Sequence, residues 1–186
     1  MAASGDQLLK LTVDKKTAKR IGRRIAIKSG LIGLLIAYLL FALMMLSWDT
    51  NYIKALFWIV DVEFKFHLFV GAVGLLSMAF LFGQLAGVEI LVKHRNYFLT
   101  GVKYGVLTLI TGTLIGSSVG FLQEGIQNIG GFSNPFYDYY FKPLYWVTMY
   151  GIMPAIIVGL LFGHQIKRQG QKRLNEDASS QQKVWQ

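Results

Sequence analysis

The stretch from Ser29 to Ser47, SGLIGLLIAYLLFALMMLS, is an apolar run without a single charged residue. A helix needs about 20 mainly apolar residues to cross the ~30 Å of hydrocarbon in a bilayer. The run is therefore long enough to span a membrane. Its apolar core is too long for a secretory signal peptide, 28 residues precede it and no small-x-small cleavage site follows, so we predict a permanent span.

Three further apolar runs of similar length cover residues 66–92, 98–122 and 144–163. Together the four runs predict an all-α integral membrane protein, a four-transmembrane-helix bundle over residues 29–163. The composition agrees, since 53% of the residues are hydrophobic, mean hydropathy is +0.43 and 20 residues are glycine. Residues 1–28 are predicted to form a cytoplasmic basic amphipathic segment, and residues 164–186 a cytoplasmic polar tail. The segment Tyr52–Val60 is apolar but too short to span, and we expect an interfacial or re-entrant helix there.

Lysine and arginine are distributed unequally between the two sides of these spans. Fifteen of them precede the first span, lie between spans two and three, or follow the fourth, whereas the two opposite loops hold only Lys54, Lys65 and Lys142. Loops rich in these residues stay on the cytoplasmic side, so both termini are predicted to be cytoplasmic. The expected location is the bacterial inner (plasma) membrane.

The positive charge also indicates a class of partner. The formal net charge is +9, but the basic residues lie at the ends of apolar runs, which favours the lipid bilayer over nucleic acid as the partner. Those expected to contact anionic lipids of the inner leaflet are Lys19, Arg20, Arg23, Arg24 and Lys28. Cysteine is absent, which excludes disulfides and thiol chemistry, and no spacing typical of a metal site occurs.

Weak internal similarity predicts that the bundle consists of two duplicated, parallel hairpins. Shifts of 75, 77 and 80 residues align Arg20 with Arg95, Asp61-x-x-Phe64-Lys65 with Asp138-x-x-Phe141-Lys142, and Leu81-Phe82-Gly83 with Leu161-Phe162-Gly163. Apolar sequences produce such matches by chance within spans, but the loop match is harder to obtain that way. Each unit would start inside, as in parallel repeats about an axis along the membrane normal.

Small residues recur at four-residue spacing in the second and third spans. They are Gly83 and Gly87 in the second span, and Gly101, Gly105, Gly112, Gly116 and Gly120 in the third. Such stripes allow helix backbones to approach closely in a membrane. The face on span three is predicted to make the closest helix contact, either with span two or with another subunit.

A few polar residues in or near the spans could carry chemistry: Gln84, Glu89, Lys93, Lys103 and Glu124. Lys93 follows Glu89 by four residues, the order that favours an ion pair on a helix, and a proton or cation site at Glu89 is the alternative. Lys103 can extend to the inner surface, and Gln84 is expected to hydrogen-bond a neighbouring helix. Glu124 lies at the outer end of the glycine stripe.

Two histidines, His94 and His164, are predicted at the inner ends of spans two and four. They could share a depth and hold a b-type haem between facing helices. Interfacial histidines beside Lys and Arg are commoner without a cofactor, so we favour the absence of one.

Three functions follow from these patterns. The favoured hypothesis is a non-enzymatic membrane subunit that packs in a larger complex or self-associates, because packing surface is abundant and convergent polar groups are few. A small channel or transporter is the first alternative, suggested by the duplication and by the polar face of span three. A b-type haem electron-transfer protein that uses His94 and His164 is the second.

Overall fold

Four long helices make up most of the chain in the computed structural model, which describes residues 13–48, 51–61, 65–129 and 134–184. They are α2 (Lys15–Trp48), α5 (Lys65–Leu91), α6 (Tyr97–Gly120) and α7 (Lys142–Val184). Short helices connect them: α3 (Tyr52–Leu56), α4 (Trp58–Asp61), η1 (Phe121–Gly125), η2 (Ile126–Asn128) and η3 (Tyr137–Phe141). The described residues contain no strand. All four long helices are apolar and long enough to cross a membrane, as the sequence predicts.

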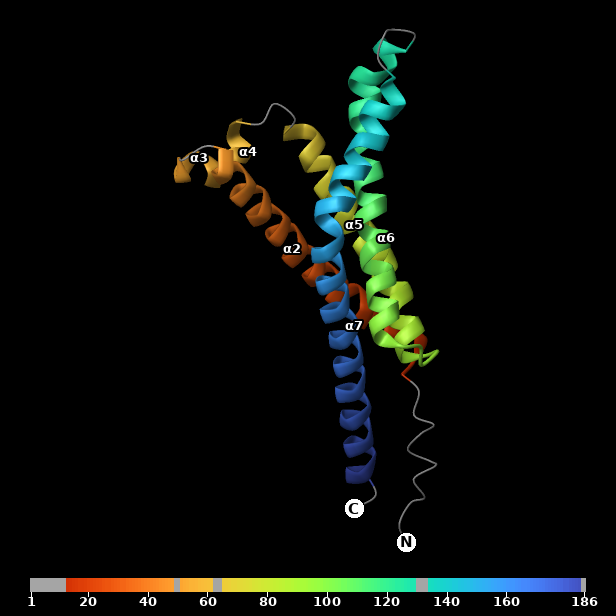
Figure 1. Cartoon of the computed structure of the whole chain (residues 1–186). Coiled ribbons are helices and arrows are strands. Elements are labelled where there is room, and N and C mark those ends of the chain that lie inside the picture. The colour runs from red at the N-terminus through yellow and green to blue at the C-terminus, as the bar shows by residue number, and fades with distance from the viewer. Residues whose placement is uncertain (1–12, 49–50, 62–64, 130–133, 185–186) are drawn as a thin grey trace.

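The helices run alternately up and down, so that loops of one kind gather at each end of the bundle (Figure 1). The start of α2, the turn between α5 and α6, and the C-terminal half of α7 lie at one end, which we call the basic end. Helices α3, α4 and η1–η3 lie at the other, which we call the aromatic end. At the aromatic end α2 diverges from α7, and the two helices cross near the basic end.

Helix α2 starts much earlier than the apolar run that predicted it. The helix begins at Lys15 and continues without interruption through Lys28, where the sequence suggested a boundary. Ala18, Gly22 and Ala26 are buried on one face, while the basic residues between them are exposed. The basic segment is therefore the first part of a helix that packs against α5.

Helix α7 likewise extends far beyond its apolar part. It runs through Pro154 and ends only at Val184, so the predicted polar tail is helical. At 1.5 Å per residue its 43 residues are ~65 Å long, about twice the hydrocarbon thickness. Its C-terminal part projects from the bundle as a single helix (Figure 1).

The segment expected as one interfacial helix is divided into α3 and α4. Asn51 caps α3, because its side-chain oxygen accepts bonds from the backbone N–H groups of Ile53 and Lys54. Tyr38 of α2 donates a hydrogen bond to the Leu56 carbonyl, and the Trp58 ring lies 4.2 Å from the Phe41 ring. These contacts attach the segment to the outer part of α2.

Two seams of glycine and alanine hold the bundle together at the basic end. In the first, between α2 and α5, a Cβ added at Gly22 would stand 2.0 Å from the Gly83 carbonyl oxygen, and one at Gly87 2.3 Å from the Ala18 oxygen. In the second, between α6 and α7, the helix backbones are equally close. There a Cβ at Gly101 would stand 2.2 Å from the Gly159 oxygen, and one at Gly163 2.1 Å from the Tyr97 oxygen.

A third seam joins the two hairpins through α5 and α6. A Cβ added at Gly116 would lie 3.2 Å from the Gly71 Cα, and one at Gly112 would lie 2.9 Å from the Leu75 Cβ. The main buried cluster includes Ile25, Ile90 and Ile166, all near the basic end. Close packing at this end leaves the aromatic half of the α2–α7 side open.

Candidate functional site: an apolar cavity and a paired carboxylate

The open side of the bundle contains a cavity of about 760 Å³. Helices α2 and α7 form its two walls, and α5 and α6 contribute its floor. On α2 the lining positions recur at helical spacing, and small residues predominate among them: Ala26, Ser29, Gly30, Gly33 and Ala37. The cavity is thus built by the face of α2 that would otherwise contact α7.

The lining presents hydrocarbon and very few polar atoms. Two hydroxyl groups on the floor are already bonded inside the protein. Thr108 Oγ1 donates to the Tyr104 carbonyl oxygen at 2.7 Å, and the Tyr104 hydroxyl donates to Glu89 Oε1 at 3.2 Å. Within the described residues no group of three His, Cys, Asp or Glu side chains could hold a metal. What this lining can do chemically is hold an apolar group.

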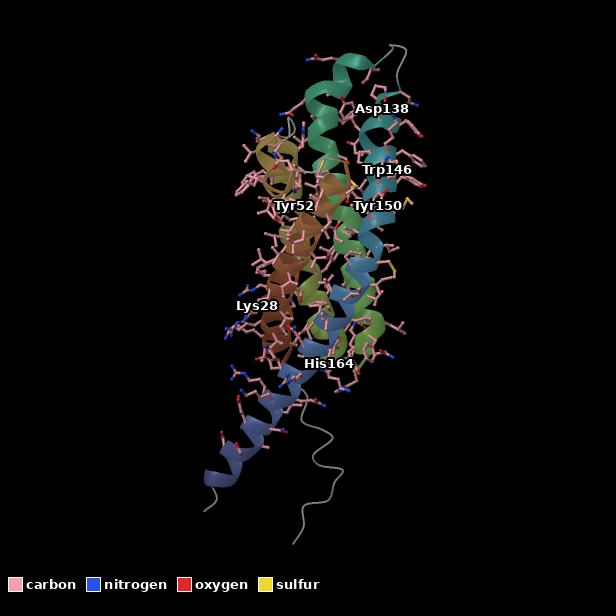
Figure 2. The ribbon with its side chains drawn as sticks, turned by 60° about the vertical axis from the view of Figure 1, so that its left-hand side comes forward. Lys28, Tyr52, Asp138, Trp146, Tyr150 and His164 are labelled. Carbon is pink, nitrogen blue, oxygen red and sulfur yellow. The ribbon has the colours of Figure 1, made fainter. Side chains whose placement is uncertain are left out.

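Two aromatic side chains on α7 mark the cavity at the aromatic end. Trp146 and Tyr150 line it, their rings stack at a centroid distance of 5.8 Å, and each is about half exposed. Figure 2 shows both on the outer part of α7, far from Lys28 and His164. Such amphipathic rings are typical of membrane–water interfaces.

A second polar site lies where α5 meets α6 at the basic end. Glu89 is the central group, with a side chain that is only 14% exposed. Its Oε1 lies 3.4 Å from Arg95 Nη1 and 3.9 Å from Lys103 Nζ, and it accepts the hydrogen bond from Tyr104. Arg95 and Lys103 are themselves about half exposed. The carboxylate is thus held by three partners on α6 and the preceding turn.

The predicted helical ion pair between Glu89 and Lys93 is wrong, because the helix ends too early. Helix α5 stops at Leu91, and Lys93 is an exposed residue of the turn. The turn places His94 at a φ of 52° and brings the Arg95 backbone N–H 3.0 Å from the Glu89 carbonyl oxygen. Arg95 therefore takes the place that helical spacing assigned to Lys93.

The other polar candidates do not converge on either site. Gln84 is half-buried on α5 and belongs neither to the cavity lining nor to the Glu89 partners. Glu124 falls in η1, and its side chain lies outside the described residues. The basic residues at positions 19, 20, 23, 24 and 28 are all exposed, and the Arg23 guanidinium lies 5.1 Å from the centre of the Phe80 ring.

The two candidate haem ligands lie at the basic end, outside the cavity. His94 is exposed in the α5–α6 turn. His164 is exposed on α7, where its ring lies 6.2 Å from that of Tyr97. Neither lines the cavity, so the described space of suitable size offers a haem no histidine.

The predicted glycine stripe of α6 is divided between two neighbours in the same chain. Gly101 and Gly105 face α7, whereas Gly112 and Gly116 face α5. Gly120 meets the Tyr139 ring of η3. Contact with another subunit through this face remains a prediction, and the face is already covered by the chain's own helices.

Several functional positions were missed by sequence reasoning. The seam residues Ala18 and Gly22 were read as part of a basic segment, although Ala18-x-x-x-Gly22-x-x-x-Ala26 has the same spacing as the glycine stripe. Tyr104 and Arg95 became partners of Glu89 only through the turn. The cavity itself has no signal in the sequence, because it depends on the angle between α2 and α7.

Comparison with protein-family models, with curated proteins and with solved structures gives no match. The function is therefore argued from the geometry of the chain.

Removal of the Tyr104 hydroxyl should weaken the bundle measurably. Tyr104→Phe deletes the bond to Glu89 and should lower stability by about 0.6–1.5 kcal/mol, the range for hydrogen bonds between membrane helices and in soluble proteins. Unfolding in mixed detergent and SDS micelles measures the change. Tyr150→Phe is the control, since Tyr150 is half exposed on the cavity wall, and equal losses in both variants would contradict the role of the Glu89 bond.

Proposed function

We propose that this chain is a non-enzymatic integral membrane protein that crosses a bilayer four times and acts as a subunit of a larger membrane assembly, formed with other proteins or with copies of itself. The observation that carries the proposal is the projecting arm of α7. Leu174 packs against the buried cluster at its edge, yet the helix continues to Val184. Ten helical residues without a packing surface are marginally stable in water.

Local ion pairs account for only part of the stability of this arm. Glu176 lies 3.9 Å from Lys172 Nζ and 3.7 Å from Arg173 Nη1, but all three side chains are at least half exposed. Exposed pairs of this kind contribute about 0.3–0.5 kcal/mol each. Docking against another subunit would supply the remaining stabilisation.

The orientation follows from the two ends of the bundle. Lys28 and His164 lie toward the basic end, whereas Tyr52, Asp138, Trp146 and Tyr150 lie toward the aromatic end (Figure 2). Fifteen Lys and Arg residues belong to the basic end and three to the other. We therefore assign the basic end, with both termini, to the cytoplasmic side of the plasma membrane, where its positive charge faces anionic lipid.

A subunit role accounts for the site better than a channel does. A polar pathway needs side chains that face a water-filled space, and the hydroxyls of α6 do not provide them. Thr108, Thr111 and Thr113 donate to carbonyl oxygens of their own helix at 2.7, 2.7 and 2.8 Å. The cavity beside them is lined with hydrocarbon.

Duplication of a two-helix hairpin would account for the repeated seams. The contacts of Ala18, Gly22 and Ala26 with Gly83 and Gly87 resemble those of Tyr97, Gly101 and Gly105 with Gly159 and Gly163. The first helices of the two hairpins then correspond at a separation of 79 residues, and the second helices at 76. This register differs from the shifts of 75, 77 and 80 that the sequence suggested, because backbone contacts rather than residue identity define it.

Truncation of the arm tests the subunit role. The full chain in native nanodiscs should have a mass well above its 20.9 kDa, and a chain that ends at Leu174 should fold but lose that excess. Mass photometry and native mass spectrometry give the measurement. The control Ser179→Ala/Ser180→Ala alters exposed hydroxyls and should keep the assembly. A monomeric full-length chain, or one whose mass is unchanged by truncation, would refute the proposal.

A further inference from the structure

We infer that the cavity between α2 and α7 binds an acyl chain of a phospholipid from the leaflet at the aromatic end. The inference rests on the proposed insertion of the bundle in a membrane. The cavity volume of about 760 Å³ lies within the ~300–1,000 Å³ range of small-molecule sites. Its walls diverge toward the aromatic end, where lipid can enter.

The cavity is long enough for a chain of one leaflet. Its lining on α7 extends from Trp146 to Phe162, which is ~24 Å at 1.5 Å per residue. One leaflet contributes about half of the ~30 Å of hydrocarbon. An acyl chain whose ester group lies near Trp146 would therefore be enclosed over its full length.

The chemistry of the walls selects hydrocarbon over water or a polar ligand. Water is held in buried sites by two to four polar partners, and the floor hydroxyls of Tyr104 and Thr108 are already bonded within the protein. An empty cavity would forfeit the dispersion contacts of its lining. At this depth a membrane offers acyl chains in excess, and they match the apolar surface.

The two ends of the cavity fit a lipid that enters from the aromatic end. At the mouth, the stacked rings of Trp146 and Tyr150 present an apolar face inward and a polar edge toward the interface. At the closed end, Phe82 and Phe162 cover the seam residues. A headgroup can thus remain at the aromatic end while its chain reaches toward the closed end.

The pairing of small residues explains why this side can open. In the 79- and 76-residue register, Gly112 and Gly116 correspond to Gly33 and Ala37, and their partners on α5 correspond to positions on α7. The α5–α6 seam is closed, whereas a Cβ added at Gly33 would meet nothing within 4 Å. The α2–α7 side thus lacks the contacts that its counterpart makes, and the acyl chain occupies their place.

A helix of another subunit fits this space less well. A helix ~10 Å wide and ~24 Å long would require ~1,900 Å³, more than twice the volume of the cavity. A second copy of the chain is therefore assigned to surfaces other than this cavity.

Spin labels can identify the occupant, because the chain has no native cysteine. A label on Gly33→Cys in phospholipid bilayers should be relaxed by oxygen and shielded from a water-soluble nickel chelate. Leu35→Cys is the lipid-facing control, since Leu35 is 58% exposed, and Ala86→Cys is the buried control at 0%. Nickel access at Gly33 would indicate a water-filled space. Shielding from both reagents, or a cross-linked dimer through Gly33→Cys, would indicate a protein helix, and each of these results would overturn the inference.

Retention of lipid gives an independent measurement. After detergent exchange, native mass spectrometry should find about one phospholipid per wild-type chain and per Leu35→Phe chain, and at least five-fold less in Gly33→Phe. Ala37→Phe serves the same purpose should Gly33→Phe fail to fold. Equal retention in the filled variants, or none in the wild type, would refute the inference. If the Leu35 label itself is inaccessible to oxygen, the proposed membrane insertion fails, which separates the two hypotheses.

Discussion

Replacement of Gly101 by leucine is expected to abolish the folded protein. A Cβ at this position would stand 2.2 Å from the Gly159 carbonyl oxygen and 3.1 Å from the Gly163 backbone. Both atoms belong to the backbone of α7, so no side chain can rotate to relieve the clash. Overpacking of side chains ordinarily costs about 1–3 kcal/mol, and separation of two helix backbones should cost more.

The measurement is the yield of monodisperse protein, followed by the unfolding midpoint of whatever folds. Gly22→Leu should have a similar effect, because its Cβ would stand 2.0 Å from the Gly83 oxygen in the corresponding seam. Gly33→Leu is the matched control on α2. Its Cβ enters open space, and glycine itself costs up to ~1 kcal/mol in a helix, so stability should be unchanged or slightly higher. Similar yields for Gly101→Leu and Gly33→Leu would refute the seam.

The same glycines show how far the sequence predicts the fold. Spacing identified the stripe on α6, and apolar length identified four spans, because both depend on local properties of the chain. The stripe could not reveal that its first half faces α7 and its second half faces α5. That division depends on how the helices cross, which nonlocal contacts determine.

Helix boundaries were missed for a related reason. Apolar length marks the depth of hydrocarbon, but nothing in the backbone ends a helix at the membrane surface. Residues 15–28 contain Lys, Arg, Ala and Ile and no proline, so α2 forms through the whole segment. Conversely, Asn96 accepts bonds from the Phe98 and Leu99 N–H groups and fixes the start of α6. The turn before it explains why Arg95, and not Lys93, reaches Glu89.

Charge reversal at Arg23 and Arg24 is expected to disrupt the orientation of the chain in the membrane. Both side chains are exposed, so Arg23→Glu/Arg24→Glu should leave the α2–α5 seam intact while it changes the charge beside the first span by four units. Positive residues within about 15–20 residues of a span determine its orientation, and the first span usually dominates. A mixed population should result.

Single cysteines report the orientation in intact cells. In the wild-type chain Gln127→Cys, at the aromatic end, should react with a membrane-impermeant maleimide, and Ser179→Cys, on the α7 arm, should not. In the double variant both positions should react in part. The control Lys172→Glu/Arg173→Glu makes the same change of charge after the last span, where it should have little effect. Labelling of Ser179→Cys in the wild-type background would place the basic end outside and reverse the proposed topology, whereas an unchanged pattern in the double variant would show that charges elsewhere at the basic end suffice to orient the bundle.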